Sequence, residues 1–268
     1  MKIGVVGAAG RMGRMNIAAV LATECVELAG AVARSGSDAV GTDAGLLAGT
    51  SACGVPVTDD AVALFAEADV VIDFTVPEAT RAFAELAAQG KTAHVIGTTG
   101  LSAEDHAALD MAARHTPLMI GANMSMGVNL LAALSQRVAA ILDEDFDIEI
   151  VEMHHRHKID APSGTALLLG QSAADGRGVN LDDRADRGRD GHTGERRPGN
   201  IGFASLRGGD VVGDHTVIFA GPGERVELGH KSSDRRIFAR GAIKAARWLV
   251  GRKPGIYGMA DVLGLRDL

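Results

Sequence analysis

The strongest constraint on the fold is an alternation of short apolar runs with amphipathic segments over the first 125 residues. The runs are continuously apolar, as in strands buried on both faces, and the segments between them follow a helical period. Predicted strands cover 2–7, 26–32, 69–74, 93–97 and 118–121, and predicted helices cover 11–22, 77–89 and 102–114. This alternation specifies an α/β fold with a doubly wound, Rossmann-like parallel sheet.

After about residue 125 the pattern changes, which predicts a second domain. The expected order is a helix over 127–142, a strand over 146–153, a helix over 163–174, a polar glycine-rich loop over 175–200, and strands over 201–207, 215–220 and 225–230. We expect an α+β domain with an open mixed, mostly antiparallel sheet. An amphipathic helix over 234–250 would return to the first domain, giving domains of 1–125 with 235–268, and 126–234.

Composition excludes several classes of function. Hydrophobic residues make up 46 % of the chain, which argues against disorder, and the net charge of −7 argues against nucleic-acid binding. The longest apolar runs are too short to cross a membrane, and two cysteines cannot form a disulfide framework. No signal peptide is evident at the N-terminus, so we expect a cytoplasmic protein.

A glycine-rich turn joins the first strand to the first helix. It reads Gly7-Ala8-Ala9-Gly10-Arg11-Met12-Gly13. A helix N-terminus offers unpaired N–H groups to a pyrophosphate, and glycines let the backbone approach it closely. The spacing G-x-x-G-x-x-G is looser than the strict dinucleotide motif, but its place between strand and helix favours a dinucleotide site over a turn without a ligand.

The end of the second predicted strand bears on the choice of cofactor. NAD-selective folds place a carboxylate there, whereas this chain has Ala33 and Arg34. A guanidinium pairs with a 2′-phosphate, so NADPH is favoured and NADH stays possible. The alternative is that Arg34 is a solvated loop residue.

Two later loops follow predicted strands at the same edge of the sheet. They read Gly97-Thr98-Thr99-Gly100 and Gly121-Ala122-Asn123-Met124-Ser125. Doubly wound folds bind ligands at the carboxyl ends of their strands, so these loops can line the ribose and the nicotinamide. Plain turns would account for them equally well.

A basic cluster, His154-His155-Arg156-His157-Lys158, is the most informative stretch for chemistry. Imidazoles exchange protons near neutral pH, and Lys158 adds a positive charge or a proton. Ser163 is a suitable N-cap for a helix whose first N–H groups, at Gly164 and Thr165, can bind a carboxylate. Together they predict a receptor for a small polycarboxylate.

The same cluster is compatible with a zinc site or with a purely solvated role. His154 with His157, or His155 with His157, could chelate zinc, but the chain offers no clear further ligands, so we expect no metal. The cluster could also be a solvated basic strand end.

The stretch from Glu152 to Ala166 resembles the signature E-x-H-H-x-x-K-x-D-x-P-S-G-T-A of the 4-hydroxy-tetrahydrodipicolinate reductase (dihydrodipicolinate reductase) family. The resemblance spans the whole chain. It also includes Val6–Gly13, Gly97–Gly100, Ala122–Ser125 and Arg207–His215.

This resemblance implies roles for individual residues. His154 matches the family's general acid/base and Lys158 its proton donor, His155 a substrate ligand, and Gly164 with Thr165 the pair that holds a substrate carboxylate. The implied cofactor-binding residues are Gly7, Ala8, Ala9, Gly10, Arg11, Met12, Arg34, Gly97, Thr98, Thr99, Gly121, Ala122, Asn123 and Met124. Ala33 stands where the family often has an acid, and Met124 where it often has an aromatic residue.

The implied reaction is NAD(P)H-dependent reduction of 4-hydroxy-tetrahydrodipicolinate, through dihydrodipicolinate, to tetrahydrodipicolinate in lysine and diaminopimelate biosynthesis. The substrate is a small dicarboxylate, and the family implies a homotetramer formed through the second domain's sheet. Two rivals remain: a related two-domain reductase of another small acid or imine, and a non-catalytic NADP-sensing protein. The related reductase would not require the basic cluster, and the NADP-sensing protein would not require an acid/base set. The presence of these groups therefore counts against both alternatives.

Overall fold

The computed structural model describes residues 1–266 and 268, and its backbone contacts divide the chain into two units. The first unit is Met1–Ser125 with Arg236–Gly264, and the second is Met126–Arg235 with Leu265–Leu268. Against the expected domains, Arg235 and the segment after Gly264 group with the second unit instead of the first.

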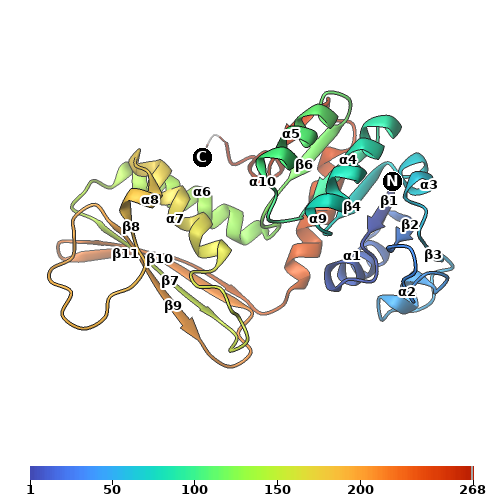
Figure 1. Ribbon diagram of the computed structural model, residues 1–268. Helices are drawn as coiled ribbons and strands as arrows, with labels where there is room; N and C mark the ends of the chain where they lie inside the picture. Colours follow the sequence, from blue (N-terminus) through green and yellow to red (C-terminus); the bar gives the residue numbers. More distant parts are fainter. Residues whose placement is uncertain (267) are drawn as a thin grey trace. The chain divides into compact units, whose positions relative to one another are not determined.

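A parallel sheet forms the centre of the first unit (Figure 1). Its strands are β1 (Lys2–Val6), β2 (Glu27–Val32), β3 (Val57–Thr58), β4 (Val70–Asp73), β5 (Ala93–Ile96), β6 (Pro117–Ile120) and β12 (Gly255–Tyr257). The spatial order is β12-β6-β5-β4-β1-β2-β3, and every neighbouring pair is parallel. This confirms the predicted Rossmann-like class; β3 and β12 are short strands that the sequence pattern did not predict.

Helices surround this sheet, and local residues set their ends. They are α1 (Arg11–Leu21), α2 (Ala44–Leu47), α3 (Ala61–Glu67), α4 (Pro77–Gly90), α5 (Ala103–Ala112), α9 (Arg236–Leu249) and α10 (Met259–Leu263). A capping box between Ser102 and Asp105 begins α5, and Pro77 begins α4. Helix α9 packs on α1 and on the central strands, so the C-terminal segment completes the core of the first unit.

The second unit has a mixed sheet ordered β11-β10-β7-β9-β8. The strands are β7 (Asp147–His154), β8 (Ala185–Asp186), β9 (Ile201–Arg207), β10 (Gly213–Gly221) and β11 (Glu224–Ser232). β10 pairs antiparallel with β7 and β11, while β9 pairs parallel with β7 and β8. Along β7 every second residue, from Ile148 to His154, is buried.

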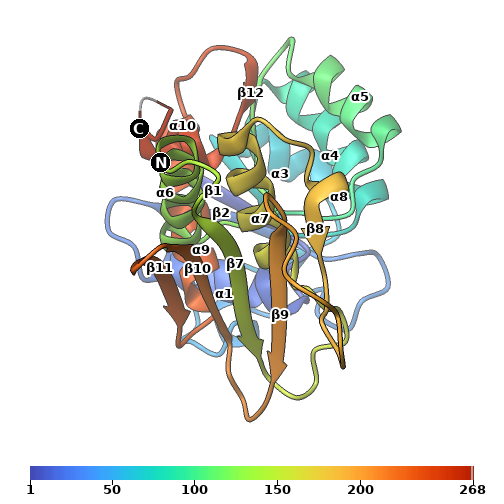
Figure 2. The same ribbon diagram turned by 90° about the vertical axis from the view of Figure 1, so that its left-hand side faces the viewer.

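Helices α6 (Met126–Ile141) and α7 (Gly164–Arg177) pack on one face of this sheet (Figure 2). Helix α7 ends at Gly178, which adopts a left-handed φ of 65°. The expected loop over 175–200 is wrong in part, because it contains the end of α7, helix α8 (Leu181–Arg184) and strand β8. None of the helices that the structure describes is long and apolar enough to cross a membrane.

Candidate active site

The glycine turn between β1 and α1 is tightly packed. Gly7 has φ 68°, and a Cβ on Gly13 would lie 2.1 Å from the Gly7 carbonyl oxygen, so only glycine lets the helix approach the turn this closely. Gly10 is the N-cap of α1 and provides no side-chain cap. The first N–H groups of the helix therefore suit an anionic ligand such as a pyrophosphate.

The other predicted residues of this turn and those beyond β2 fall into three groups. Arg11 and Arg34 are exposed, and Ala8 is buried, as is Ala33, which precedes Arg34; the predicted residues Ala9 and Met12 are half-buried. Arg34 is the second residue beyond the end of β2. Neither residue 33 nor residue 34 is a carboxylate. The electrostatic argument for a 2′-phosphate, which depends on the Arg34 guanidinium, therefore still applies at this end of the strand.

Asp73 closes strand β4 and is completely buried. Its Oδ1 accepts hydrogen bonds from the Thr75 backbone N–H (2.9 Å) and hydroxyl (2.6 Å), and its Oδ2 accepts one from the Thr80 hydroxyl (2.8 Å). His94 Nε2 lies 3.3 Å from Oδ2. Burial opposes ionisation, but His94 and the threonine donors outweigh it, so the pKa of Asp73 lies below its ordinary value.

The Asp73 cluster reaches two of the predicted cofactor loops. Thr98 Oγ1 lies 2.8 Å from Thr80 Oγ1 and accepts a hydrogen bond from the Thr75 N–H at 3.1 Å. A Cβ on Gly7 would lie 2.7 Å from Thr75 Cγ2, so the cluster also packs against the glycine turn. One buried carboxylate thus connects the turns that follow β1, β4 and β5.

The remaining predicted cofactor residues differ in accessibility. Thr99 and Ala122 are exposed, whereas Gly97, Gly121 and Asn123 are half-buried. Met124 is only 1 % exposed and belongs to the core of the first unit. Its side chain and backbone are therefore both packed inside the unit, and a Cβ on Gly241 would lie 1.7 Å from the Met124 carbonyl oxygen.

In the second unit, the predicted acid/base His154 is held by a carboxylate. His154 Nδ1 lies 2.6 Å from Glu152 Oε2, and Arg207 donates to both oxygens of Glu152 at 2.8 Å. The Ser163 N–H adds a bond to Oε1 at 3.2 Å. Burial opposes ionisation, but Arg207, His154 and Ser205 lower the pKa of Glu152 to about 2.

A second buried imidazole, His215 on β10, lies beside His154 with the ring centres 5.1 Å apart. Its Nε2 is 3.0 Å from the Ser163 hydroxyl oxygen, which also accepts the N–H of Ala166. Burial and the neighbouring His154 lower the pKa of His215 to about 4. His215 is therefore neutral at pH 7, and its Nε2 and the Ser163 hydroxyl share one hydrogen bond.

The loop between β9 and β10 closes around this cluster through its backbone. Gly208 N–H donates to the His154 carbonyl at 2.9 Å, and His155 N–H donates to the Val211 carbonyl at 2.7 Å. A Cβ on Gly213 would lie 3.0 Å from His154 Nε2, so the glycine leaves room beside that nitrogen. This close approach accounts for Gly213, and a left-handed φ of 53° accounts for Gly209.

Lys158 and His155 each have a charged partner. Lys158 Nζ binds both carboxylate oxygens of Asp160, at 2.7 and 2.9 Å, and this bond lowers the pKa of Asp160. Arg235 Nη2 lies 3.2 Å from His155 Nε2. Burial and the Arg235 charge lower the pKa of His155, so its Nε2 accepts from the guanidinium.

Helix α7 begins where the sequence predicts. Ser163 is its N-cap and accepts the N–H of Ala166, and Gly164 and Thr165 form its first turn. A Cβ added to Gly164 would meet no described atom within 4 Å, so the helix start is open on that side. A carboxylate can approach these N–H groups.

The second unit thus brings together His154, Lys158, His155 and the start of α7, all predicted from sequence. Four contributors were given no role there: Glu152, Arg207, His215 and Arg235. Glu152 was detectable in principle, because residues two apart on a strand share a face. Arg207 and His215 lie far along the chain and arrive through strand pairing, whereas Arg235 lies between β11 and α9.

The zinc alternative gains no support from the geometry. His154 Nδ1 is engaged by Glu152, and the rings of His155 and His157 lie 6.2 Å apart. Within residues 1–266 and 268, no group of three or more His, Cys, Asp or Glu side chains is arranged to hold a metal.

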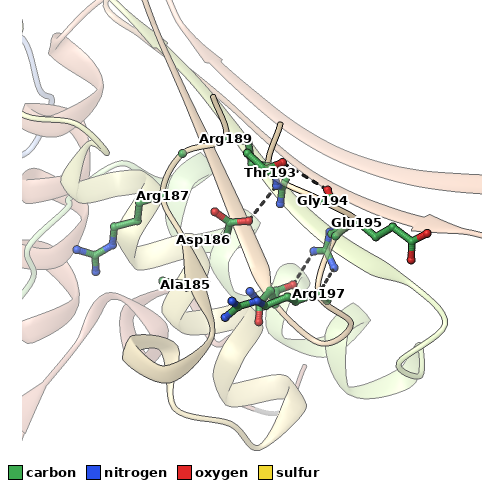
Figure 3. Close-up of a pocket in the computed structure, with 11 residues that line it drawn as sticks. Ala185, Asp186, Arg187, Arg189, Thr193, Gly194, Glu195 and Arg197 are labelled. Atoms are coloured by element: carbon green, nitrogen blue, oxygen red, sulfur yellow. Dashed lines mark hydrogen bonds and ion pairs between the residues drawn. The ribbon is translucent and has the colours of Figure 1, made fainter. Parts of the chain in front are cut away.

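A separate cavity of about 290 Å³ lies on the 185–200 segment of the second unit (Figure 3). Two of the arginines that line it are already matched by carboxylates: Arg189 bonds Glu149 and Asp186, and Arg196 bonds Glu149 and Asp147. The cavity contains none of the predicted site residues. We therefore assign these arginines to the anchoring of this segment, and we assign the cavity no part in catalysis.

Comparison with known proteins gives matches over nearly the whole chain. Residues 1–124 match the family model described as dihydrodipicolinate reductase, N-terminus, and residues 127–263 match the one for its C-terminus. A 4-hydroxy-tetrahydrodipicolinate reductase from Beijerinckia indica subsp. indica is 58 % identical over 99 % of this chain and 98 % of its own length. The same enzyme from Ruegeria pomeroyi is 59 % identical over 97 % of each chain.

A solved structure has the same fold. The dipicolinate-bound dihydrodipicolinate reductase from Paenisporosarcina sp. TG-14 superposes with a TM-score of 0.74 at 24 % identity, covering 97 % of this chain and 98 % of that one.

Proposed function

The chain belongs to the dihydrodipicolinate reductase family, and we propose that the groups gathered around His154 in its second unit carry the proton transfers of the family's reaction. The protein is an NAD(P)H-dependent oxidoreductase that reduces 4-hydroxy-tetrahydrodipicolinate to tetrahydrodipicolinate in lysine and diaminopimelate biosynthesis. The assignment of roles depends chiefly on one observation: an ionised Glu152 holds His154, and Lys158 and the start of α7 belong to the same unit.

When bound, NAD(P)H supplies the hydride that adds to C4 of the unsaturated ring left after the 4-hydroxyl group departs as water. The electron pair that the ring gains must then be met by a proton. Lys158 is the proton donor in this proposal, and His154 is the general acid/base that exchanges protons with the substrate. Each turnover consumes one hydride and one proton and releases one water.

The substrate is a dicarboxylate, and the second unit offers matching groups. The first N–H groups of α7, at Gly164 and Thr165, bind one carboxylate, and His155 contributes a further polar contact. The Lys158 ammonium, which Asp160 engages at 2.7 Å, adds positive charge to the same site. The overall charge of −7 does not prevent this, because the cations are local.

The cofactor loops of the first unit fit a dinucleotide, and we propose NADPH as the preferred form. The cradle made by Gly7 and Gly13 has no room for a side chain, and the start of α1 lacks a side-chain cap. Arg34 is exposed at the end of β2, where a 2′-phosphate would be recognised.

Replacing Arg34 tests this preference. Arg34→Ala should raise the KM for NADPH by about 10-fold, because a hydrogen bond to a charged group is worth about 1.5 kcal/mol. The KM for NADH should stay unchanged, as should both KM values in the control Arg114→Ala, whose arginine is exposed at the end of α5. Equal losses with both nucleotides would contradict a role on the 2′-phosphate.

We further propose a homotetramer and cytoplasmic residence. The face of the second unit's sheet opposite α6 and α7 carries half-buried or exposed apolar side chains, namely Val151, Met153, Leu206 and Ile218. Such a face is suited to packing against other copies of the chain. Cytoplasmic residence agrees with a biosynthetic reaction that draws on reduced nicotinamide cofactor.

The activity itself is tested by following the oxidation of NADPH and of NADH with freshly generated 4-hydroxy-tetrahydrodipicolinate. We expect turnover with NADPH and a product identified as tetrahydrodipicolinate. Tight NADPH binding without turnover would favour the NADP-sensing alternative instead.

A further inference from the structure

The carboxylate of Glu152 has more partners than a structural ion pair requires. Its two oxygens accept from both terminal nitrogens of Arg207, from the Ser163 N–H and from His154 Nδ1. The side chain is 1 % exposed, so these protein donors replace its hydration. The partners come from β7, β9 and the N-cap of α7, which fixes the carboxylate in one place.

A carboxylate held in this way imposes a tautomer on His154. With a pKa of about 2, Glu152 is ionised throughout the neutral range and has no proton to give. At 2.6 Å the imidazole must therefore be the donor, with its proton on Nδ1. Nε2, which lies beside Gly213, is then the nitrogen that exchanges protons.

We propose that Glu152, clamped by Arg207, is the positioning residue that fixes the orientation and tautomer of His154 for proton exchange through Nε2. This inference rests on the proposed role of His154 and adds the residue through which that role is prepared. The arrangement follows the logic by which a buried carboxylate orients the histidine of a catalytic triad.

The other charged groups around His154 are consistent with this assignment. His215, packed against the ring from β10, stays neutral, and Arg207 from β9 is paired with Glu152 itself. His155 and Lys158 follow on the same segment and are engaged by Arg235 and Asp160. Glu152 is therefore the carboxylate that contacts the imidazole directly.

The substitution Glu152→Gln separates positioning from packing. The amide keeps the shape but has one acceptor, so its NH₂ group must face a former donor. Placed at Oε1 it would oppose both Arg207 and the Ser163 N–H, whereas at Oε2 it would oppose Arg207 and face His154 Nδ1, which can accept. The second arrangement costs less, and it moves the His154 proton from Nδ1 to Nε2.

The chain contains a matched control on the same strand. Glu149 lies on the opposite face of β7 and also binds two arginines, Arg189 and Arg196, but no histidine. Glu149→Gln breaks a comparable cluster of charges in the same sheet. A merely structural effect should therefore be shared by the two variants.

The experiment combines ¹⁵N NMR of histidine-labelled protein with steady-state kinetics, with His154→Asn used to assign the resonances. We expect wild type and Glu149→Gln to carry the His154 proton on Nδ1, and Glu152→Gln to carry it on Nε2. In Glu152→Gln, kcat should fall by about 10²-fold or more while NADPH binding is unchanged.

Failure of the inference and failure of the proposed function give different results. A wild-type His154 protonated on Nε2, or a Glu152→Gln variant with the wild-type tautomer, overturns the inference even if the enzyme is active. An inactive wild type overturns the function, and the tautomer is still readable. If Glu152→Gln does not fold, Glu152→Asp keeps the charge for Arg207 but shortens the reach, and it should give mixed tautomers with intermediate kcat; the wild-type tautomer and kcat in this variant overturn the inference.

Discussion

Asp73 links two predicted cofactor loops to a single buried side chain. Thr75 and Thr80 bond its carboxylate directly, and the Thr98 hydroxyl lies 2.8 Å from Thr80 Oγ1 and 3.4 Å from the carboxylate. A buried carboxylate is stable only when its oxygens are hydrogen-bonded or paired with a charge. Replacing it therefore also disturbs the groups that bond to it. The cluster holds turns that are far apart in sequence but adjacent at the carboxyl edge of the sheet.

Asp73→Asn should weaken cofactor binding more than it slows the chemistry. The amide removes one acceptor and the attraction to His94, so the free energy of unfolding should fall by about 1–3 kcal/mol and the Kd for NADPH should rise. Urea unfolding and fluorescence titration measure the two effects. Asp69→Asn, at the opposite end of β4, is the control, and equal changes in both variants would refute the role in the loops.

Among the strands, Gly202 on β9 leaves the space in which residues 187–200 are anchored. A Cβ at this position would lie 2.0 Å from a carboxylate oxygen of Glu149. That carboxylate bonds Arg189 and Arg196, which hold the segment against β7. The glycine therefore makes space for an ionic anchor.

Gly202→Ala should release this segment without unfolding the sheet. Displacing Glu149 removes about 1 kcal/mol of anchoring, so limited trypsin cleavage within 187–200 should accelerate by about 5-fold. Gly229→Ala is the matched control in the same sheet, because its Cβ would meet its nearest neighbour at an ordinary 3.8 Å. Equal protection of the two variants would show that Glu149 does not anchor the segment.

The helices and strands differ in how well the sequence predicts them. Helix α4 and strand β5 were readable because Pro77 and a continuous apolar run mark them. Strand β3 has two residues, Val57–Thr58, which are too few for any period to show. The Glu152–Arg207 pair joins residues 55 apart, and only the register of β7 with β9 brings them together.

In our proposal the whole molecule has a first unit that binds the dinucleotide and a second unit that binds the substrate, and four chains associate. The sheet face with Val151, Met153, Leu206 and Ile218 is the surface proposed for that association. Leu206 is 50 % exposed in the single chain, a costly exposure for a side chain of its size.

Leu206→Glu should therefore reduce the oligomer. A charge placed in an apolar interface is desolvated without a partner, so light scattering should report fewer than four chains for the variant and four for the wild type. Leu130→Glu, an equally large change at an exposed side chain of α6, should leave the mass unaltered. A wild type that is monomeric would overturn the tetramer.

The most direct test of the central claim, that the second unit supplies the proton for this reduction, is the kcat of Lys158→Ala with freshly generated 4-hydroxy-tetrahydrodipicolinate and NADPH. We expect kcat to fall by about 10²-fold or more, with the Kd for NADPH unchanged. Lys231→Ala, which removes an exposed lysine of the same unit, should keep wild-type turnover. Wild-type kcat in Lys158→Ala would contradict the account.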